Sequence, residues 1–323
     1  MVKVLVVILN KNNAQGLRRA LGSLVKQTVP ICRVFDVLVL DGGSEDESEE
    51  VVLEFAKTFK CIEFRVQKVK GGTGPARIEA CNYAYERGYD VIIWGDSENV
   101  YDANYVAELV RMVVKKGCDV AGGKPVVRGS LWDHAFFWYH AVHLVFPRLW
   151  EKHVPGNNKC MRIHLCKEIG YPPSRRAEDY GFTLRMLKTK RRFKYCVDDD
   201  AVVTVSLPQR LGDIIKWQLL RARGAAEAAA YVGAVPWDSW VWFLLLLTLL
   251  VGLLLSPVAP WGLLLLAPFA ILCAYLAFRA PRFIANFSFF KLVGLPVGLL
   301  IHSLFSIYTL FEYTSIRSRL SRG

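Results

Sequence analysis

The sequence predicts two parts: an α/β domain with a mostly parallel sheet, and a helical membrane domain after it. Strand-like and helix-like segments alternate over about residues 2–120, and this alternation is typical of a parallel sheet with helices on both faces. After about Val235 the chain changes to Leu-rich runs. Hydrophobic residues make up 53% of the 323 positions, which is too large a share for a wholly soluble protein.

Over about residues 2–120 the sequence predicts four strands and three helices. Met1–Leu9 has an apolar core of about six residues and no small-residue cleavage site, so we interpret it as a strand rather than a signal peptide. The predicted strands are Val2–Leu9, Val34–Leu40, Ile62–Val66 and Val91–Trp94, and the predicted helices are Gly16–Lys26, Ser44–Thr58 and Ala76–Arg87.

Polar or glycine-rich residues follow each predicted strand, at Asn10–Asn13, Asp41–Ser44, Lys70–Gly74 and Asp96–Glu98. In open α/β sheets, ligands bind beyond the carboxyl ends of the strands. We therefore expect all four segments to line one crevice.

Asp96 and Glu98 end the apolar stretch that begins at Asp90. On an extended backbone, residues i and i+2 point the same way, and two converging carboxylates are tolerable only beside a cation. Their oxygens suit Mg²⁺ or Mn²⁺, which neutralises a diphosphate as its bond breaks. The alternative is two solvated acids in a turn.

A dinucleotide-binding fold is the main rival on sequence. It requires G-x-G-x-x-G directly after a strand, and Gly72–Gly74 is followed by Arg77 where the third glycine belongs. The net charge of +12 is compatible with nucleic acid, anionic lipid or phosphorylated substrates. No nucleic-acid module is recognisable, so membrane lipids and phosphorylated substrates are the favoured partners.

The apolar runs after Val235 are Trp240–Leu255, Trp261–Phe278 and Leu292–Phe311, each close to the roughly 20 residues that cross a bilayer. Buried core helices are the alternative. Tryptophans near the proposed ends favour a membrane interface.

The charges between the runs predict orientation. Arg279, Arg282 and Lys291 lie between the second and third runs, so this loop is expected in the cytoplasm together with the α/β domain. With three spans the basic tail after Arg317 would lie outside, so the last run is re-entrant or the tail is an exception.

The eight cysteines contain no C-x-x-C pair, so we expect no zinc site and mostly reduced, buried thiols. Pairing of Cys160 with Cys166 stays open. The aromatic-rich stretch between Val126 and Pro155 contains His140 and His143, and a helix at the bilayer surface explains it better than a metal site.

Five stretches together resemble family 2 inverting glycosyltransferases over about residues 2–206. In chain order they read LVVILNKNNAQGLRRALGSLVKQT, VLVLDGGSED, KGGTGPARIEACNYA, VIIWGDSEN and RRAEDYGFTLRMLK. With KWQLLRARG and the apolar runs behind it, the chain looks like a small membrane-bound member of the cellulose-synthase-like branch. Gln218 and Arg221 match the Q-x-x-R-W signature of that branch, and Ala222 replaces its tryptophan.

This resemblance implies a GT-A-like nucleotide-diphospho-sugar transferase fold and a donor site. In it Asp96 and Glu98 hold the metal, and Asp96 also contacts the nucleotide-sugar. Asp41 accepts from the nucleotide base, with a helix cap as the alternative. The other implied donor contacts are Asn10, Gly72 for close backbone approach, and Arg77 for the diphosphate or the paired acids.

The resemblance also implies catalytic residues. Asp179 is the expected base and Glu178 its orienting partner, at a helix N-terminus where a carboxylate stays anionic. Inversion requires a base on the sugar face opposite the leaving group. Gln218 and Arg221 lie on the predicted surface helix Leu211–Arg223 and are expected to contact the acceptor and the diphosphate. Capping pairs and a plain amphipathic linker are the alternatives.

The sequence thus predicts three regions: a cytoplasmic glycosyltransferase domain over residues 1–207, an interfacial helix and linker over 208–235, and a transmembrane domain over 236–323 in a multi-pass cell-membrane protein. The expected reaction moves one sugar, by analogy mannose from GDP-mannose, to a lipid-linked saccharide with Mn²⁺ or Mg²⁺. The alternatives are transfer to polyprenyl phosphate, processive polysaccharide synthesis and a non-catalytic membrane scaffold.

Overall fold

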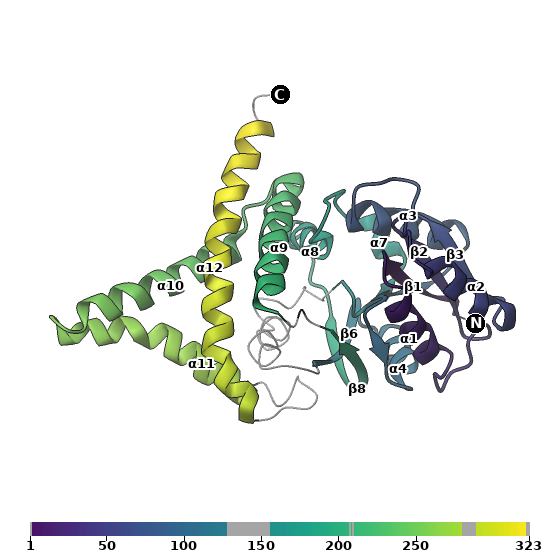
Figure 1. Ribbon diagram of the computed structural model, residues 1–323, viewed down its shortest axis with the longest axis horizontal. Helices are drawn as coiled ribbons and strands as arrows, with labels where there is room; N and C mark the ends of the chain where they lie inside the picture. The colour runs from purple at the N-terminus through teal and green to yellow at the C-terminus, as the bar shows by residue number, and fades with distance from the viewer. Residues whose placement is uncertain (1, 128–155, 207, 209, 280–288, 321–323) are drawn as a thin grey trace.

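The computed structural model describes residues 2–127, 156–206, 208, 210–279 and 289–320 of the chain. Within them, an α/β domain comes first and a group of long helices lies to one side of it (Figure 1). The aromatic-rich stretch with His140 and His143 lies almost wholly outside the described residues.

Eight described strands form one mixed sheet in the order β3-β2-β1-β4-β7-β6-β8-β5. The first four strands in this order are mutually parallel, β6 is parallel to β8, and β7 is antiparallel to both β4 and β6. Each of the four predicted strands is present within two residues of its expected bounds. The strands are β1 (Val4–Asn10), β2 (Phe35–Asp41), β3 (Ile62–Val66), β4 (Val91–Asp96), β5 (Val100–Tyr101), β6 (Val120–Val127), β7 (Lys159–Arg162) and β8 (Tyr195–Val205).

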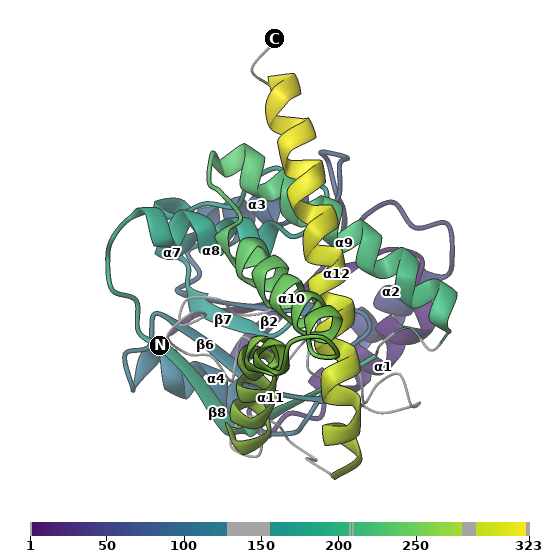
Figure 2. The ribbon, with the colours of Figure 1, turned by 90° about the vertical axis from the view of Figure 1, so that its left-hand side faces the viewer.

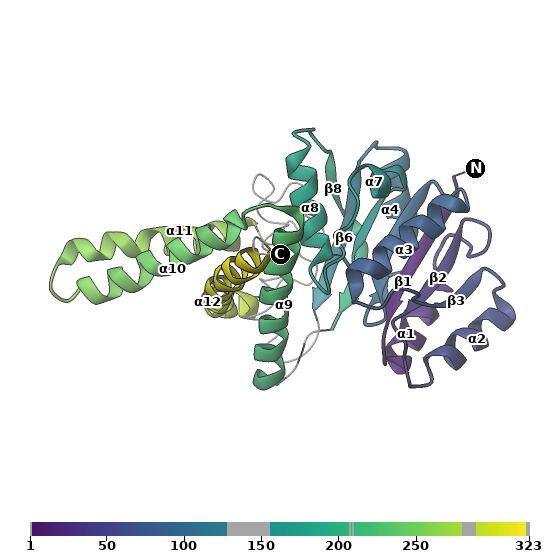
Figure 3. The same ribbon diagram turned by 90° about the horizontal axis from the view of Figure 1, so that it is seen from above.

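Helices cover both faces of the sheet, which confirms the predicted fold class (Figure 3). One core layer joins Val4, Val6 and Ile8 to α1 (Ala14–Leu24), α2 (Ser48–Thr58) and α4 (Tyr105–Val114). The other joins Leu5 and Val7 to α3 (Thr73–Glu86), α7 (His164–Glu168) and α8 (Glu178–Lys188). Burial on both faces explains why the strands are continuous apolar runs.

The strand order reverses beside β1. The chain runs from β1 outwards through β2 and β3, and then returns to place β4 on the other side of β1. Leu9 near the end of β1 pairs with Asp96 at the end of β4. Ligands bind at such a switch point, beyond the carboxyl ends of the strands, and this places Asp96 at the mouth of the crevice.

Long helices follow the sheet: α9 (Leu211–Val232), α10 (Trp237–Leu255), the 3₁₀ segment η1 (Pro260–Leu266), α11 (Ala267–Arg279) and α12 (Phe289–Leu320). Three stretches are long and apolar enough to cross a membrane: Trp237–Leu255, Pro260–Phe278 and Leu292–Arg319. α10 and α11 form a hairpin that points away from the α/β domain. α12 runs crosswise to this hairpin (Figures 1 and 2).

Two disulfides correct the expectation of reduced thiols. Cys32 pairs with Cys61, and Cys118 pairs with Cys196. Cys160 and Cys166 are separate buried thiols, so the open question of their pairing is answered in the negative.

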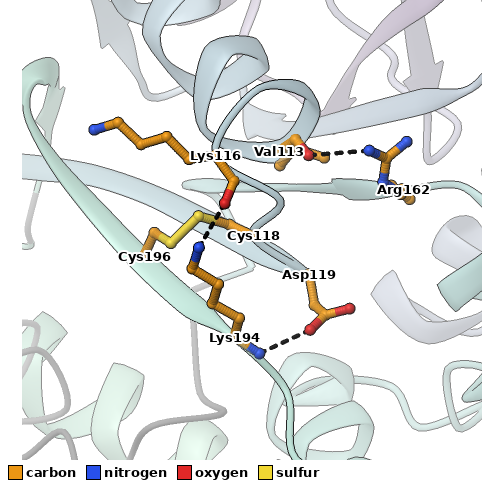
Figure 4. Close-up of a disulfide and its surroundings, with 7 residues drawn as sticks. All are labelled: Val113, Lys116, Cys118, Asp119, Arg162, Lys194 and Cys196. Atoms are coloured by element: carbon orange, nitrogen blue, oxygen red, sulfur yellow. Dashed lines mark hydrogen bonds between the residues drawn. A yellow bond between two sulfur atoms is a disulfide. The ribbon is translucent and has the colours of Figure 1, made fainter.

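Both disulfides lie at or next to the amino ends of strands, at the edge of the sheet opposite the crevice. Figure 4 shows Cys118 and Cys196 beside Lys194, whose backbone N–H donates to Asp119 Oδ2 at 2.7 Å. The second bond therefore fastens the start of β6 to the start of β8.

Asp198–Asp200 lie within a strand, although three consecutive acidic residues are more typical of a turn. These residues belong to β8, where the pairing with β6 shifts register between Gly123 and Lys124. A Cβ at Gly123 would lie 2.1 Å from the Ala201 carbonyl oxygen, so the irregular pairing requires glycine there.

Candidate active site

The main cavity has a volume of about 770 Å³ and lies where the α/β domain meets the long helices. Its walls come from the segments after β1 and β4, from α8 and α9, and from the facing sides of α10 and α12. Seven of the predicted site residues line it: Arg77, Asp96, Glu98, Glu178, Asp179, Gln218 and Arg221. Asn10, Asp41 and Gly72 do not.

Asp96 lies in an environment that disfavours negative charge. Burial raises the pKa of Asp96 to about 7; the Arg77 guanidinium opposes this shift, and the nearby carboxylates of Glu98, Glu178 and Asp179 add to it. Burial also raises the pKa of Glu98. These four carboxylates all line the cavity, and Asp238 is a fifth.

This donor set fits a hard divalent cation only in part. Within the described residues, no group of three or more His, Cys, Asp or Glu side chains is arranged to hold a metal ion. Asp96 and Glu98 offer carboxylate oxygens, which Mg²⁺ and Mn²⁺ accept. Such an ion would therefore need further oxygens from a bound phosphate group or from water, as is usual for Mg²⁺ at substrate phosphates.

Arg77 is tied to Glu178 rather than to the Asp96–Glu98 pair. Its Nε donates to Glu178 Oε1 at 2.5 Å, and the Thr73 hydroxyl donates to the other oxygen of the same carboxylate. The guanidinium also lies 4.7 Å from the Trp94 ring centroid. Arg77 Nη1 is buried and has no hydrogen-bond partner among the described residues, so its two N–H groups remain for a ligand.

Asp179 is in the first turn of α8, and Ala177 before the helix has a left-handed backbone, with φ of 56°. Asp179 Oδ2 accepts a hydrogen bond from the Gly156 backbone N–H at 3.0 Å. A Cβ at Gly156 would lie 2.5 Å from Arg77 Nη2 and 3.3 Å from Asp179 Cβ, so a larger residue here would displace the Arg77 guanidinium. The Tyr180 backbone N–H donates to the other oxygen, Asp179 Oδ1, at 2.8 Å. Backbone donors and a helix N-terminus both stabilise negative charge.

Asn10 and Asp41 are hydrogen-bonded to each other and do not line the cavity. Asn10 Nδ2 donates to Asp41 Oδ1 at 2.8 Å. Asp41 Oδ2 accepts from the Ser44 backbone N–H at 2.6 Å and from the Gly43 backbone N–H at 2.9 Å. Asp41 is 1% exposed, and its contacts close the turn after β2, much as the capping alternative expected. The helix after this turn, α2, begins at Ser48 and not at Ser44.

Gly72 packs closely against the backbone of Arg175. It has φ of 103°, and a Cβ there would lie 2.1 Å from the Arg175 carbonyl oxygen. The Thr73 backbone N–H donates to that same oxygen at 3.1 Å. The glycine loop therefore packs against the segment before α8, while Thr73 and Arg77 behind it reach the cavity.

Sequence reasoning missed several residues in the walls. Lys11, Asn12 and Asn13 follow β1 and were visible as a polar strand end, although only Asn10 was singled out. Lys159 at the start of β7 is not in the cavity wall but lies close enough to interact with Asp179 and Glu178. It is 2% exposed, and burial lowers its pKa to about 8, while those two carboxylates oppose this shift. Other missed residues are Arg19, Arg176, Tyr180, Asp238 and His302.

α9 forms part of the cavity wall opposite the sheet, through Trp217, Gln218 and Arg221. Gln218 is 2% exposed, and its Nε2 has no hydrogen-bond partner among the described residues. The Arg221 guanidinium lies 4.6 Å from the Trp217 ring centroid, and burial lowers the pKa of Arg221 to about 9.

A mixed sheet with carboxylates at its switch point and buried cations beside them defines an α/β enzyme of the nucleotide-sugar transferase class. Comparison with known proteins gives the family. The chain belongs to glycosyl transferase family 2, whose model matches residues 5–166.

Among curated proteins, the glycosyltransferase AglE of Haloferax volcanii (strain DS2) is 26% identical over 121 residues. The match covers 37% of this chain and 38% of AglE, so it spans well under half of the relative's length.

Solved structures share the GT-A fold. The mannosyltransferase PcManGT from Pyrobaculum calidifontis, in complex with GDP-Man and Mn²⁺, is 16% identical with a TM-score of 0.61, and the match covers 96% of this chain and 86% of that one. The glucosyl-3-phosphoglycerate synthase of Mycobacterium tuberculosis, in complex with Mn²⁺, UDP and phosphoglyceric acid, is 14% identical with a TM-score of 0.55. That match covers 72% of this chain and 80% of the other.

Proposed function

We propose that the protein is a metal-dependent inverting glycosyltransferase of the small cellulose-synthase-like type. It moves a single sugar from a nucleotide-diphosphate donor to a saccharide presented at the membrane. One observation carries the proposal: Asp96 and Asp179 line the same cavity, and this cavity continues between α9, α10 and α12.

The donor half of the cavity contains both acids and cations. Asp96 and Glu98 would hold Mn²⁺ or Mg²⁺, which when bound neutralises the charge that develops on the leaving diphosphate. Arg77 donates an unpaired N–H to a diphosphate oxygen. Lys11 and Arg19 add positive charge at the end of the cavity beyond β1, where the nucleotide lies.

Asp179 acts as the base. It accepts the proton of the acceptor hydroxyl while that oxygen bonds to the anomeric carbon, and the bond from that carbon to the diphosphate breaks with its electron pair leaving on the phosphate oxygen. Attack from the face opposite the leaving group inverts the anomeric configuration. Glu178 positions the start of α8 through its bonds to Arg77 and Thr73.

We propose GDP-mannose as the donor to test first, because one structural neighbour, whose match covers 96% of this chain, is a mannosyltransferase in complex with GDP-Man. The acceptor is a lipid-linked saccharide. Helices beside the cavity hold the hydroxyl of a poorly soluble substrate near Asp179, which is catalysis by positioning.

We further propose a multi-pass cell-membrane protein with three regions, at residues 1–207, 208–235 and 236–323, and with the first on the cytoplasmic side. Three apolar helical stretches support membrane insertion. The charges of Arg279, Arg282 and Lys291 after the hairpin support the orientation.

The test is a donor screen on the full-length protein, scored by nucleotide release in the presence of membrane lipid extract. Asp179→Asn is expected to lower release by about 10²–10⁴-fold, the usual contribution of general base catalysis. Asp213→Asn, an exposed position on α9, is the control and should behave as wild type. Equal release from Asp179→Asn and wild type would remove Asp179 as the base.

A further inference from the structure

α12 has two opposite faces. His302, Phe305, Ser306 and Thr309 line the cavity at the i, i+3, i+4, i+7 spacing of one helix face. The exposed apolar residues of α12 lie half a turn away from this set, because a helix has 3.6 residues per turn. They are Val293, Val297, Leu304, Ile307 and Phe311, exposed between 38% and 71%.

This arrangement makes α12 a wall between the cavity and the surroundings of the helix. Its outer face carries the exposed apolar residues, and the stretch Leu292–Arg319 as a whole is apolar enough to cross a membrane, with a mean hydropathy of 1.7. Polar residues within an apolar membrane segment are costly and commonly face a substrate path. A substrate in the cavity would therefore account for His302, Ser306 and Thr309, the polar residues of α12 that line it.

The hydroxyls on α12 can accept hydrogen bonds. Ser306 donates its proton to the His302 carbonyl at 2.9 Å, and Thr309 donates to the Phe305 carbonyl at 3.2 Å. Since each hydroxyl proton is used within the helix, each oxygen presents its lone pairs to the cavity.

The facing walls supply complementary groups. Gln218 on α9 offers a buried amide Nε2 that has no partner among the described residues. On α10, Asp238 accepts from the Tyr180 hydroxyl at 2.5 Å, and Tyr180 directly follows Asp179. The polar groups on α9, α10 and α12 therefore extend to Tyr180, the residue next to the proposed base.

We propose that this half of the cavity, between α9, α10 and α12, is a subsite for the terminal sugar of the acceptor, with α12 separating that sugar from lipid. Amide and hydroxyl groups match the hydroxyls of a sugar ring. The subsite rests on the proposed transferase function and adds to it the residues that recognise the acceptor.

The test compares the double variant Ser306→Ala/Thr309→Val with Ser303→Ala. Ser303 is a matched control because it is buried on the same helix and donates to the Leu299 carbonyl at 2.8 Å, but does not line the cavity. The full-length protein is assayed in nanodiscs with a panel of nucleotide-sugars, GDP-mannose first. The acceptor probes are octyl glycosides of mannose, glucose and N-acetylglucosamine, with polyprenyl phosphate as a comparison that contains no sugar.

We expect the KM for the octyl glycoside to rise about 5-fold for each lost hydrogen bond, hence roughly 25-fold in the double variant. Nucleotide release without acceptor should match wild type, because donor binding is untouched, and Ser303→Ala should transfer normally. An unchanged KM, or an equal defect in Ser303→Ala, would overturn the subsite.

Two outcomes distinguish failure of the proposed subsite from failure of the proposed transferase function. Transfer by wild type to polyprenyl phosphate but to none of the glycosides would overturn a sugar subsite and leave a transferase. Failure of wild type to release nucleotide from any donor, with every acceptor, would instead refute the proposed function, and the subsite with it.

Discussion

Arg77 and Glu178 form a buried ion pair that joins α3 to α8, with side chains only 3% and 6% exposed. The pair holds the start of the helix that carries Asp179. Arg18 and Glu54 form an ion pair at 2.8 Å on the opposite side of the sheet, but their side chains are 50% and 59% exposed. The two pairs offer a direct comparison of buried and exposed charge.

Glu178→Ala should destabilise the protein strongly, since it leaves the Arg77 charge buried without its partner. We expect a loss of about 3–5 kcal/mol in unfolding free energy. Glu54→Ala should cost at most about 1 kcal/mol, because water screens the exposed pair. Thermal unfolding in detergent measures both, and equal shifts in Tm would contradict a structural role for the buried pair.

The approach of Asp96 and Asp179 to one cavity could be predicted from the sequence in part. The carboxyl ends of β1 and β4 meet at one edge of the sheet, so the position of Asp96 followed from the alternation of strands and helices. Asp179 lies on α8, far along the chain, and its position was expected from family resemblance alone.

Side-chain direction could not be predicted in the same way. Asp41 and Asn10 turn toward each other because the loop after β2 offers Asp41 three donors, two of them backbone N–H groups. That geometry depends on the turn, and the sequence indicated it only as the capping alternative for Asp41. The partners Cys118 and Cys196 are 78 residues apart, and spacing alone does not reveal disulfide connectivity.

Chelation should abolish sugar transfer. Asp96 and Glu98 would be the two protein ligands of the ion, and no group of three or more metal-binding side chains is found among the described residues. With so few protein ligands, the bound ion is expected to exchange readily with EDTA. Added Mn²⁺ or Mg²⁺ should restore activity. Glu98→Gln should raise the Mn²⁺ concentration needed for half-maximal transfer, measured by titration in metal-free buffer. Full activity in EDTA would exclude the proposed role of Asp96 and Glu98.

Reduction of the disulfides should lower stability without disturbing the active site, because both bonds lie at the opposite edge of the sheet. Loop closure over 29 and 78 residues contributes roughly 3–5 kcal/mol for each bond in the chain-entropy model. The measurement is Tm with and without reductant, alongside transfer at a temperature below both transitions.

Matched double variants distinguish the contributions of the two disulfides to stability. Cys32→Ala/Cys61→Ala and Cys118→Ala/Cys196→Ala should each lower Tm and lose sensitivity to reductant at that bond, while Cys273→Ala, which removes a free thiol, should keep the full response. A reductant response unchanged in both double variants would show that the disulfides do not stabilise the fold.

The crosswise course of α12 predicts its membrane placement. The hairpin of α10 and α11 points away from the α/β domain, whereas α12 packs across α9 and α10 (Figure 2). With the α/β domain in water, a hairpin that spans the bilayer leaves α12 close to the membrane plane, with its apolar face toward lipid. Two spans then place the tail after Arg317 on the same side as the α/β domain, which agrees with its positive charge.

Single cysteines labelled by a membrane-impermeant maleimide test this topology in a Cys273→Ser background. Val258 lies at the hairpin tip and is 81% exposed, so Val258→Cys should label from outside the cell. Glu50→Cys and Ser318→Cys should label only after the membrane is opened. Labelling of Ser318→Cys from outside would establish a third span instead. Labelling of Glu50→Cys from outside would reverse the orientation, and would place both disulfides in an oxidising compartment, where such bonds commonly persist.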